Sequence, residues 1–215
     1  MYNVKIFQFS PIQENTYVLY NEHKEALVID PGCYGDNEEQ ELSDFIQKEG
    51  LSLKGLLNTH CHLDHVFGLK YVSEHWQLKP QFHKMESAVL EYAPVSGMMW
   101  NMPFQVYTGP VHYLEEGDLA GLESDPLQVI FTPGHSPGHI CFYSVKQDFI
   151  IGGDVLFKGS VGRTDLPGGD FSTLENSIKT KLYVLPAETI VYPGHGPSTT
   201  IGEERLSNPY VKEMS

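Results

Sequence analysis

The run Thr59-His60-Cys61-His62-Leu63-Asp64-His65 constrains this chain more than any other stretch of its sequence. Imidazole and carboxylate groups that leave water need a hydrogen-bond partner or a cation, so a cluster this dense is ill suited to an ordinary core. If His60 and His62 lie on a chain leaving a strand, their spacing points both rings to one side. A turn at Leu63 then brings Asp64 and His65 alongside, at the start of a helix. The cluster therefore predicts a metal site at a strand-to-helix junction.

The patterning around the cluster predicts an α/β chain. Short segments rich in β-branched and aromatic residues indicate strands, and apolar residues at helical spacing indicate helices. The expected strands are residues 4–9, 15–21, 26–29 and 54–58, then 127–132, 140–145, 149–151 and 189–192. The expected helices are residues 37–49, ending at Gly50, then 64–79 and 172–185, with a short tail at 203–206. Each half begins with strands and ends with helices, which suggests two similar halves packed sheet to sheet.

Residues 85–114 are harder to interpret. A short helix through Ala88 to Leu90 is expected, but Pro94, Gly97 and later prolines should break the rest of the segment. The segment is either a flap over the site or a covering loop that buries its own Met and Trp side chains.

Three further residues end apolar runs and follow Gly or Pro, namely His135, Asp154 and His195. Glycine lets a backbone crowd close to a metal, so these strand ends are candidates to complete the site. His139 is expected to be a buried hydrogen-bonding support rather than a ligand. Cys61 alternates with its histidine neighbours and should point away from them as a small buried residue. The remaining histidines have surface-like or segment-end contexts: His23, His75, His83 and His112.

Composition excludes several classes of function. The formal net charge of −14, with 14 Lys and Arg residues in no run, argues against a nucleic-acid surface. The amino terminus has no basic segment followed by an apolar core, and no apolar run approaches a membrane span. The 3 widely spaced cysteines are typical of a reducing cytoplasm. We expect a single cytoplasmic domain that binds no membrane and no nucleic acid; its oligomeric state is not predicted.

Taken together, the His60 to His65 cluster, Thr132-Pro133-Gly134-His135, Gly153-Asp154 and Pro193-Gly194-His195-Gly196 resemble the metallo-β-lactamase superfamily, and most of all its glyoxalase II (hydroxyacylglutathione hydrolase) branch. The resemblance implies a four-layer αββα sandwich over residues 1–215, with the site along one edge of its two sheets. Glyoxalase II also has a carboxy-terminal helical domain that helps to hold glutathione. Since about 20 residues follow His195, we expect that domain to be absent, as in a shorter bacterial subgroup.

The resemblance also implies a binuclear site. His60, His62 and His135 would hold a first metal, Asp64, His65 and His195 a second, and Asp154 would bridge the two together with a hydroxide. The ions are expected to be zinc, with iron or manganese as alternatives. A metal pair makes hydroxide at neutral pH and polarises a carbonyl, so we expect a hydrolase. A thiolate leaves without a strong acid, which favours a small-molecule thioester such as a hydroxyacyl-glutathione over an amide or a β-lactam. Asp64 is a further catalytic candidate, because it could orient the hydroxide.

One loop departs from the glyoxalase II pattern. Gly162-Arg163-Thr164-Asp165 stands where that branch has a Lys-x-Tyr. Arg163 could bind a substrate carboxylate, or it could form a structural pair with Asp165 or Asp170. The same run recurs in persulfide dioxygenases of the superfamily, which use one iron, so that activity is the main enzymatic alternative. A non-catalytic metal-binding protein is the alternative outside enzymes.

Overall fold

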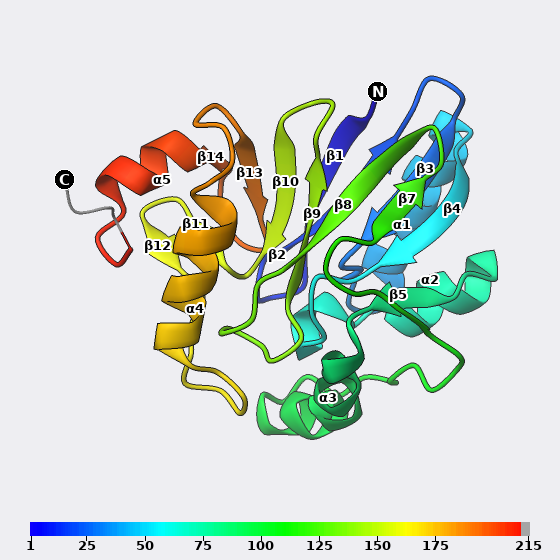
Figure 1. The fold of residues 1–215 in the computed structure, drawn as a ribbon. Helices are drawn as coiled ribbons and strands as arrows, with labels where there is room; N and C mark the ends of the chain where they lie inside the picture. Colours follow the sequence, from blue (N-terminus) through cyan, green and yellow to red (C-terminus); the bar gives the residue numbers. More distant parts are fainter. Residues whose placement is uncertain (212–215) are drawn as a thin grey trace.

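A computed structural model describes residues 1–211 and shows two six-stranded sheets facing each other (Figure 1). In the first sheet, β1 to β3 form the expected antiparallel meander, and the following strands are added in parallel. The strands of this sheet are, in order, β1 (Asn3–Phe9), β2 (Glu14–Tyr20), β3 (Glu25–Ile29), β4 (Ser52–Leu57), β5 (Pro80–Phe82) and β6 (His112–Tyr113).

The second sheet is antiparallel except for the parallel pair β10 and β13. Its order is β14 (Thr199–Thr200), β13 (Ile190–Pro193), β10 (Phe149–Gly153), β9 (Ile140–Ser144), β8 (Asp125–Phe131) and β7 (Leu119–Leu122). A separate hairpin of β11 (Leu156–Phe157) and β12 (Ser160–Val161) follows β10.

Helices cover the outer face of each sheet, which gives four layers. The first sheet packs against α1 (Asp36–Glu49), α2 (Leu69–Trp76) and α3 (Ser87–Met99). The second packs against α4 (Phe171–Ser177), which continues as a π-helical turn over Ile178–Leu182, and α5 (Ile201–Ser207). Leu27 and Leu57 of the first sheet meet Val129 and Phe142 of the second in the core between the sheets. The αββα sandwich is confirmed, and no helix within residues 1–211 is long and apolar enough to cross a membrane.

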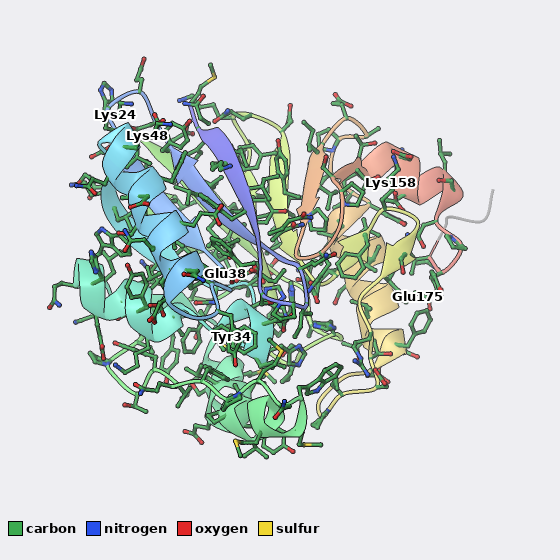
Figure 2. The ribbon with its side chains drawn as sticks, turned by 180° about the vertical axis from the view of Figure 1, so that it is seen from behind. Lys24, Tyr34, Glu38, Lys48, Lys158 and Glu175 are labelled. Carbon is green, nitrogen blue, oxygen red and sulfur yellow. The ribbon has the colours of Figure 1, made fainter. Side chains whose placement is uncertain are left out.

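Figure 2 shows α1 with Lys48 at one end and Glu38 at the other, beside Tyr34. The Glu38 carboxylate accepts hydrogen bonds from the backbone N–H groups of Ser10 and Tyr34. At the other end, Gly50 has the left-handed conformation of a helix C-cap, as the sequence predicts.

The structure corrects two expectations about the helices. The expected helix over residues 64–79 is instead a 3₁₀ turn over Leu63–His65 and then α2, which begins only at Leu69. The expected break at Pro94 is also wrong, because α3 continues through Pro94. Leu90, Ala93 and Gly97 of α3 are buried at spacings of three and four residues. Packing of this face outweighs the hydrogen bond that proline removes.

Candidate metal centre

The candidate ligands lie where strands of both sheets end. His60 and His62 follow β4, His135 follows β8, Asp154 follows β10 and His195 follows β13. Because β10 and β13 are parallel neighbours, their carboxyl ends lie at the same edge, where open α/β sheets commonly bind ligands. The structure thus brings together all seven residues that the sequence indicates.

Gly194 allows the loop of His195 to approach Asp154. A Cβ atom at position 194 would lie 2.1 Å from Asp154 Oδ1 and 2.7 Å from His65 Cε1, closer than real Cβ contacts. The start of β2 holds the same loop: the Asn15 N–H donates to the Gly194 carbonyl at 2.7 Å, and the Tyr17 hydroxyl donates to the Pro193 carbonyl. The first and last parts of the fold therefore meet at this ligand.

A first group of ligand atoms consists of His60 Nε2, His62 Nδ1 and His135 Nε2. His135 Nε2 lies 2.9 Å from His62 Nδ1 and 3.2 Å from His60 Nε2. His135 Nδ1 donates to the Arg163 carbonyl at 2.7 Å, so its Nε2 carries a lone pair. Thr59 Oγ1 donates to Asp30 and accepts from His60 Nδ1, which leaves His60 Nε2 unprotonated as well. Lone pairs that converge in this way form a group that could hold a cation.

A second group consists of Asp64, His65 and His195. Asp64 Oδ2 lies 3.1 Å from His195 Nε2 and 3.8 Å from His65 Nε2. His65 Nδ1 lies 3.1 Å from Asp30 Oδ2, and neither ring nitrogen of this buried side chain has a hydrogen-bond partner among the described residues. Each of the two groups has ligand atoms within 4.8 Å of one another. The donor set therefore suits metal ions of the kind that imidazole and carboxylate bind together.

Asp154 lies between the two groups. Its Oδ1 is 3.0 Å from His195 Nδ1 and 3.5 Å from His65 Nε2, and its Oδ2 is 3.6 Å from His135 Nε2. One carboxylate thus faces ligands of both groups. This placement is the one that a bridging ligand needs.

Burial and charge shift the pKa values of the histidines in opposite directions in the two groups. Burial lowers the pKa of His62 to about 3 and, together with the nearby His65, holds the pKa of His60 well below its ordinary value. In the second group, burial alone would lower the pKa of His195, but Asp154 and Asp64 outweigh it and raise that pKa to about 10. Against its own desolvation, the pKa of Asp154 is held well below the usual range by His195 and His65. The first group is thus neutral imidazole, the state in which histidine binds a metal.

Supporting residues hold the ligands in place. His139 is buried, donates from Nδ1 to Thr132 Oγ1 and accepts the Asp154 N–H at 3.1 Å, as expected of a hydrogen-bonding support. Cys61 is fully buried in the core between the first sheet and its helices, and the Glu86 carboxylate accepts a hydrogen bond from its backbone N–H. The histidines at positions 23, 75, 83 and 112 lie outside both ligand groups.

Sequence reasoning missed three buried acids around the centre. Asp30 accepts hydrogen bonds from Thr59 and lies 3.1 Å from His65 Nδ1. Glu14 is fully buried 3.8 Å from His65 Nδ1. Glu86 accepts hydrogen bonds from Cys61 N, Gly138 N and Ser136 Oγ, so it joins the loops that carry His62 and His135. In the sequence, each of these three residues is simply an acid beside an apolar run, and nothing else there marks it as buried.

Arg163 lies at the rim of the centre. Its guanidinium makes two hydrogen bonds to Asp165, at 2.7 and 2.8 Å, and its side chain is 49% exposed. Asp170, the other partner considered, instead caps α4 through the Thr173 N–H. The side chain thus forms the structural pair, while its backbone carbonyl orients His135.

A cavity of about 660 Å³ opens above the ligands. The α3 helix provides one wall through Val89 and Tyr92, Trp100 follows directly after the helix, and Phe157 and Leu166 lie among the residues of the other walls. Residues 87–99 are therefore a helical cover over the centre.

Two facing sheets between helical layers, with a cluster of His and Asp residues able to hold metal ions at their common edge, define the metallo-β-lactamase type of fold. The family model described as "Metallo-beta-lactamase superfamily" matches residues 10–195, and the chain belongs to this superfamily.

Curated relatives match over nearly their full lengths. "Probable metallo-hydrolase YqgX" of Bacillus subtilis is 39% identical over 95% of both chains. "Hydroxyacylglutathione hydrolase GloC" of Haemophilus influenzae is 34% identical over 99% of this chain and 100% of its own. These relatives support a metallo-hydrolase and an enzyme of the glyoxalase II-like subgroup.

Solved structures agree with this assignment. BLEG-1, a B3 metallo-beta-lactamase, has a TM-score of 0.90 at 37% identity over 98% of this chain and 100% of its own. TTHA1623, solved in a di-iron-bound form, has a TM-score of 0.86 at 38% identity over 96% and 99%. ETHE1 from Myxococcus xanthus has a TM-score of 0.79 at 26% identity over 97% and 84%.

Proposed function

We propose that this protein is a binuclear metal-dependent hydrolase that cleaves a thioester. The observation that carries the proposal is the pair of ligand groups with Asp154 between them. His60, His62 and His135 would hold one ion and Asp64, His65 and His195 the other. When bound, two divalent cations supply a hydroxide at neutral pH and polarise a carbonyl oxygen.

The chain's own residues prepare the site for that chemistry. Thr59 and the Arg163 carbonyl fix the tautomers of His60 and His135, so that their Nε2 lone pairs point toward the centre. Asp64 and Asp154 supply negative charge that offsets part of the charge of two cations. The α3 helix covers the cavity and limits the access of bulk water to the reacting bond.

A thioester suits this site because a thiolate, with an ordinary pKa near 8.5, leaves without a general acid. The name of GloC favours a hydroxyacyl-glutathione or a related thiol ester as substrate. We expect zinc in both positions, and iron is the alternative that the di-iron form of TTHA1623 supports.

Metal analysis combined with a substrate panel tests the proposal. We expect two metal ions per chain and hydrolysis of lactoyl thioesters that stops on chelation and returns on adding zinc or iron. Absence of turnover on every thioester by fully loaded protein would refute it.

Replacing Asp64 by Asn tests the second ligand group. The amide keeps the shape but loses the charge, so we expect activity to fall about 100-fold with weaker binding of one of the two ions. Asp44→Asn, at an exposed position of α1, serves as the matched control. Full activity of Asp64→Asn would contradict the mechanism.

Two rival activities each have an observation in their favour. The Gly162 to Asp165 run and the ETHE1 likeness favour a persulfide dioxygenase, which would show one iron per chain and oxygen uptake on a persulfide. The BLEG-1 likeness favours a β-lactamase. We expect lactams to be hydrolysed far more slowly than thioesters, because an amine leaving group needs a proton.

A further inference from the structure

One wall of the cavity above the ligands is the β11–β12 hairpin. It contributes Phe157, Ser160 and Val161 to the lining, and the Phe157 ring meets the His195 ring edge to face, with 6.3 Å between the ring centroids. The two strands pair through two residues each, Leu156 with Val161 and Phe157 with Ser160. A two-stranded hairpin is marginally stable at best when isolated in water. The shape of this wall therefore depends on what holds the hairpin from outside.

The base and the tip of the hairpin are held by different parts of the fold. At the base, Leu156 is fully buried in the core under α4 and α5. At the tip, the Gly159 N–H donates to the Glu204 carboxylate at 2.9 Å, and Asn208 Nδ2 donates to the Ser160 carbonyl at 3.0 Å. Glu204 belongs to α5 and Asn208 follows that helix, which lies next to the hairpin in Figure 1. The last helix of the chain thus holds the tip.

Glu204 is the common acceptor of this contact, and its side chain is buried, with 1% of the residue exposed. Its Oε2 accepts from the Gly159 N–H and from Asn208 Nδ2, and its Oε1 accepts from the Thr199 hydroxyl at 2.6 Å. Thr199 lies on β14, which pairs with β13, and His195 follows the end of β13. One carboxylate therefore joins the hairpin to the strand that follows the His195 loop.

The ligand His195 has supports of its own. The Asn15 N–H and the Tyr17 hydroxyl bind the carbonyls of Gly194 and Pro193, the two residues before it. Loss of the Glu204 carboxylate leaves these bonds in place. The wall and the metal ligands can therefore be disturbed separately.

We propose that Glu204 is a positioning residue for substrate binding, which holds Phe157 and Val161 where the substrate contacts them. Glu204 is not among the residues that line the cavity, so it acts through the hairpin and not by touching the substrate. The inference rests on the proposed function for its kinetic test. It names a residue outside the metal centre that sets the affinity for substrate.

Steady-state kinetics of the metal-loaded protein test the proposal, with lactoyl-glutathione as the substrate. We expect Glu204→Ala to raise KM about tenfold and to change kcat by less than about twofold, because the wall binds parts of the substrate that do not react. The number of metal ions per chain and the metal affinity in a chelator competition should equal those of wild type. An unchanged KM, or a fall in kcat alone, would overturn the inference.

Two further variants separate positioning from loss of charge. In Glu204→Gln, the amide oxygen can replace Oε2 and the NH₂ group can donate to the Thr199 hydroxyl, which also accepts. We therefore expect Glu204→Gln to restore a KM close to that of wild type. Glu203→Ala removes the neighbouring exposed carboxylate, which pairs with Lys158 at 3.5 Å, and should match wild type. A KM raised equally in Glu203→Ala and Glu204→Ala would mean that surface charge, not the hairpin, is responsible.

Hydrogen exchange tests the hairpin without any substrate. In metal-loaded Glu204→Ala, we expect the amides of residues 157–161 to exchange about tenfold faster than in wild type, and those of residues 58–66 at an unchanged rate. Equal protection of the hairpin in both proteins would overturn the inference. If Glu204→Ala does not fold, Asn208→Ala, which removes the bond to the Ser160 carbonyl, provides the same two readouts.

Failure of the proposed function gives a different result. If wild type hydrolyses no thioester, that function is refuted, while the exchange rates still decide whether Glu204 holds the hairpin. The comparison of KM then uses the persulfide or the lactam, whichever the protein converts, because the hairpin borders the centre for either substrate.

Discussion

At the scale of residues, the metal centre depends on which nitrogen each histidine presents. His135 and His60 have their outer nitrogens occupied by the Arg163 carbonyl and by Thr59. The contact with Arg163 joins residues far apart in the sequence, so no local pattern could predict it. The candidate ligands were predictable, because Gly and Pro before His135 and His195 mark strand ends, whereas their division into two groups was implied by the family resemblance. The buried acids Asp30 and Glu86 were not predictable, since an isolated acid carries no periodicity.

The cysteines give a first prediction at this scale. All three are free and buried, and burial raises the pKa of Cys141 to about 12. A thiol that stays protonated and inaccessible reacts slowly. We expect the native, metal-loaded protein to react negligibly with a thiol reagent over minutes and to titrate 3 thiols once unfolded in denaturant. One fast-reacting thiol in the native protein would contradict the buried role of Cys61.

His83 gives a second prediction, on pH. Burial lowers the pKa of His83 below its ordinary value of 6.5, and its Nδ1 accepts the Met85 N–H. A ring that is favoured when neutral stabilises the fold fully above pH 6.5 and loses that contribution as pH falls through its lowered pKa. We expect the difference in free energy of unfolding between wild type and His83→Ala to shrink from about pH 8 to about pH 5, measured by urea denaturation. A difference that grows on acidification would contradict the assignment.

At the scale of elements, the strands were easier to predict than the helices. The meander and the strands of the second sheet follow from β-branched runs bounded by turns. The course of α3 was hidden because Pro94 and Gly97 suggest a break, while Met98, Met99 and Trp100 are apolar yet exposed. The two-residue strand β6 lacks any pattern of its own and exists only because it pairs with β5.

Glu86 provides a prediction for the loops. Glu86→Ala leaves the Cys61 N–H, the Gly138 N–H and the Ser136 hydroxyl without their acceptor. Buried donors left unpaired destabilise a protein by about 1–3 kcal/mol each. We expect a loss of about 3 kcal/mol or more in urea denaturation, and metal affinity about tenfold weaker in a chelator competition.

Two comparison variants sharpen that experiment. Glu86→Gln keeps one carbonyl oxygen and should fall between wild type and Glu86→Ala. Glu91→Ala, at an exposed position of α3, should match wild type. If Glu86→Ala bound metal normally, the loops would not depend on this carboxylate.

At the scale of the whole molecule, the fold was predictable because the two halves repeat the same alternation of strands and helices. The pattern predicted that the halves pack sheet to sheet, but it could not supply which side chains meet between the sheets. Leu57, for example, packs against residues of the second sheet, and such packing partners cannot be identified from hydrophobicity alone.

Removal of the metal tests how far the bound ions stabilise the whole molecule against heat. Ions that bind the folded but not the unfolded chain stabilise it by about 2.7 kcal/mol at a hundredfold excess over Kd. For a chain of 215 residues this corresponds to about 5–10 °C in Tm. We expect a chelator to lower Tm by that amount in wild type and in the control variant His23→Ala, which lies outside the centre. In His195→Ala the chelator effect should be smaller; an identical shift there would place the stabilising ion elsewhere.

The contact between Asn15 and Gly194 has a consequence for the order in which the protein forms. A segment synthesised among the first holds the loop of the last ligand, so one native pairing spans almost the whole chain. Contacts so distant in sequence form late and slow the search for the native state. During translation, His60 and His62 are synthesised before His135, Asp154 and His195, the other residues of the candidate centre. The second ligand group is therefore complete only once the chain has been synthesised through His195 and this loop has docked.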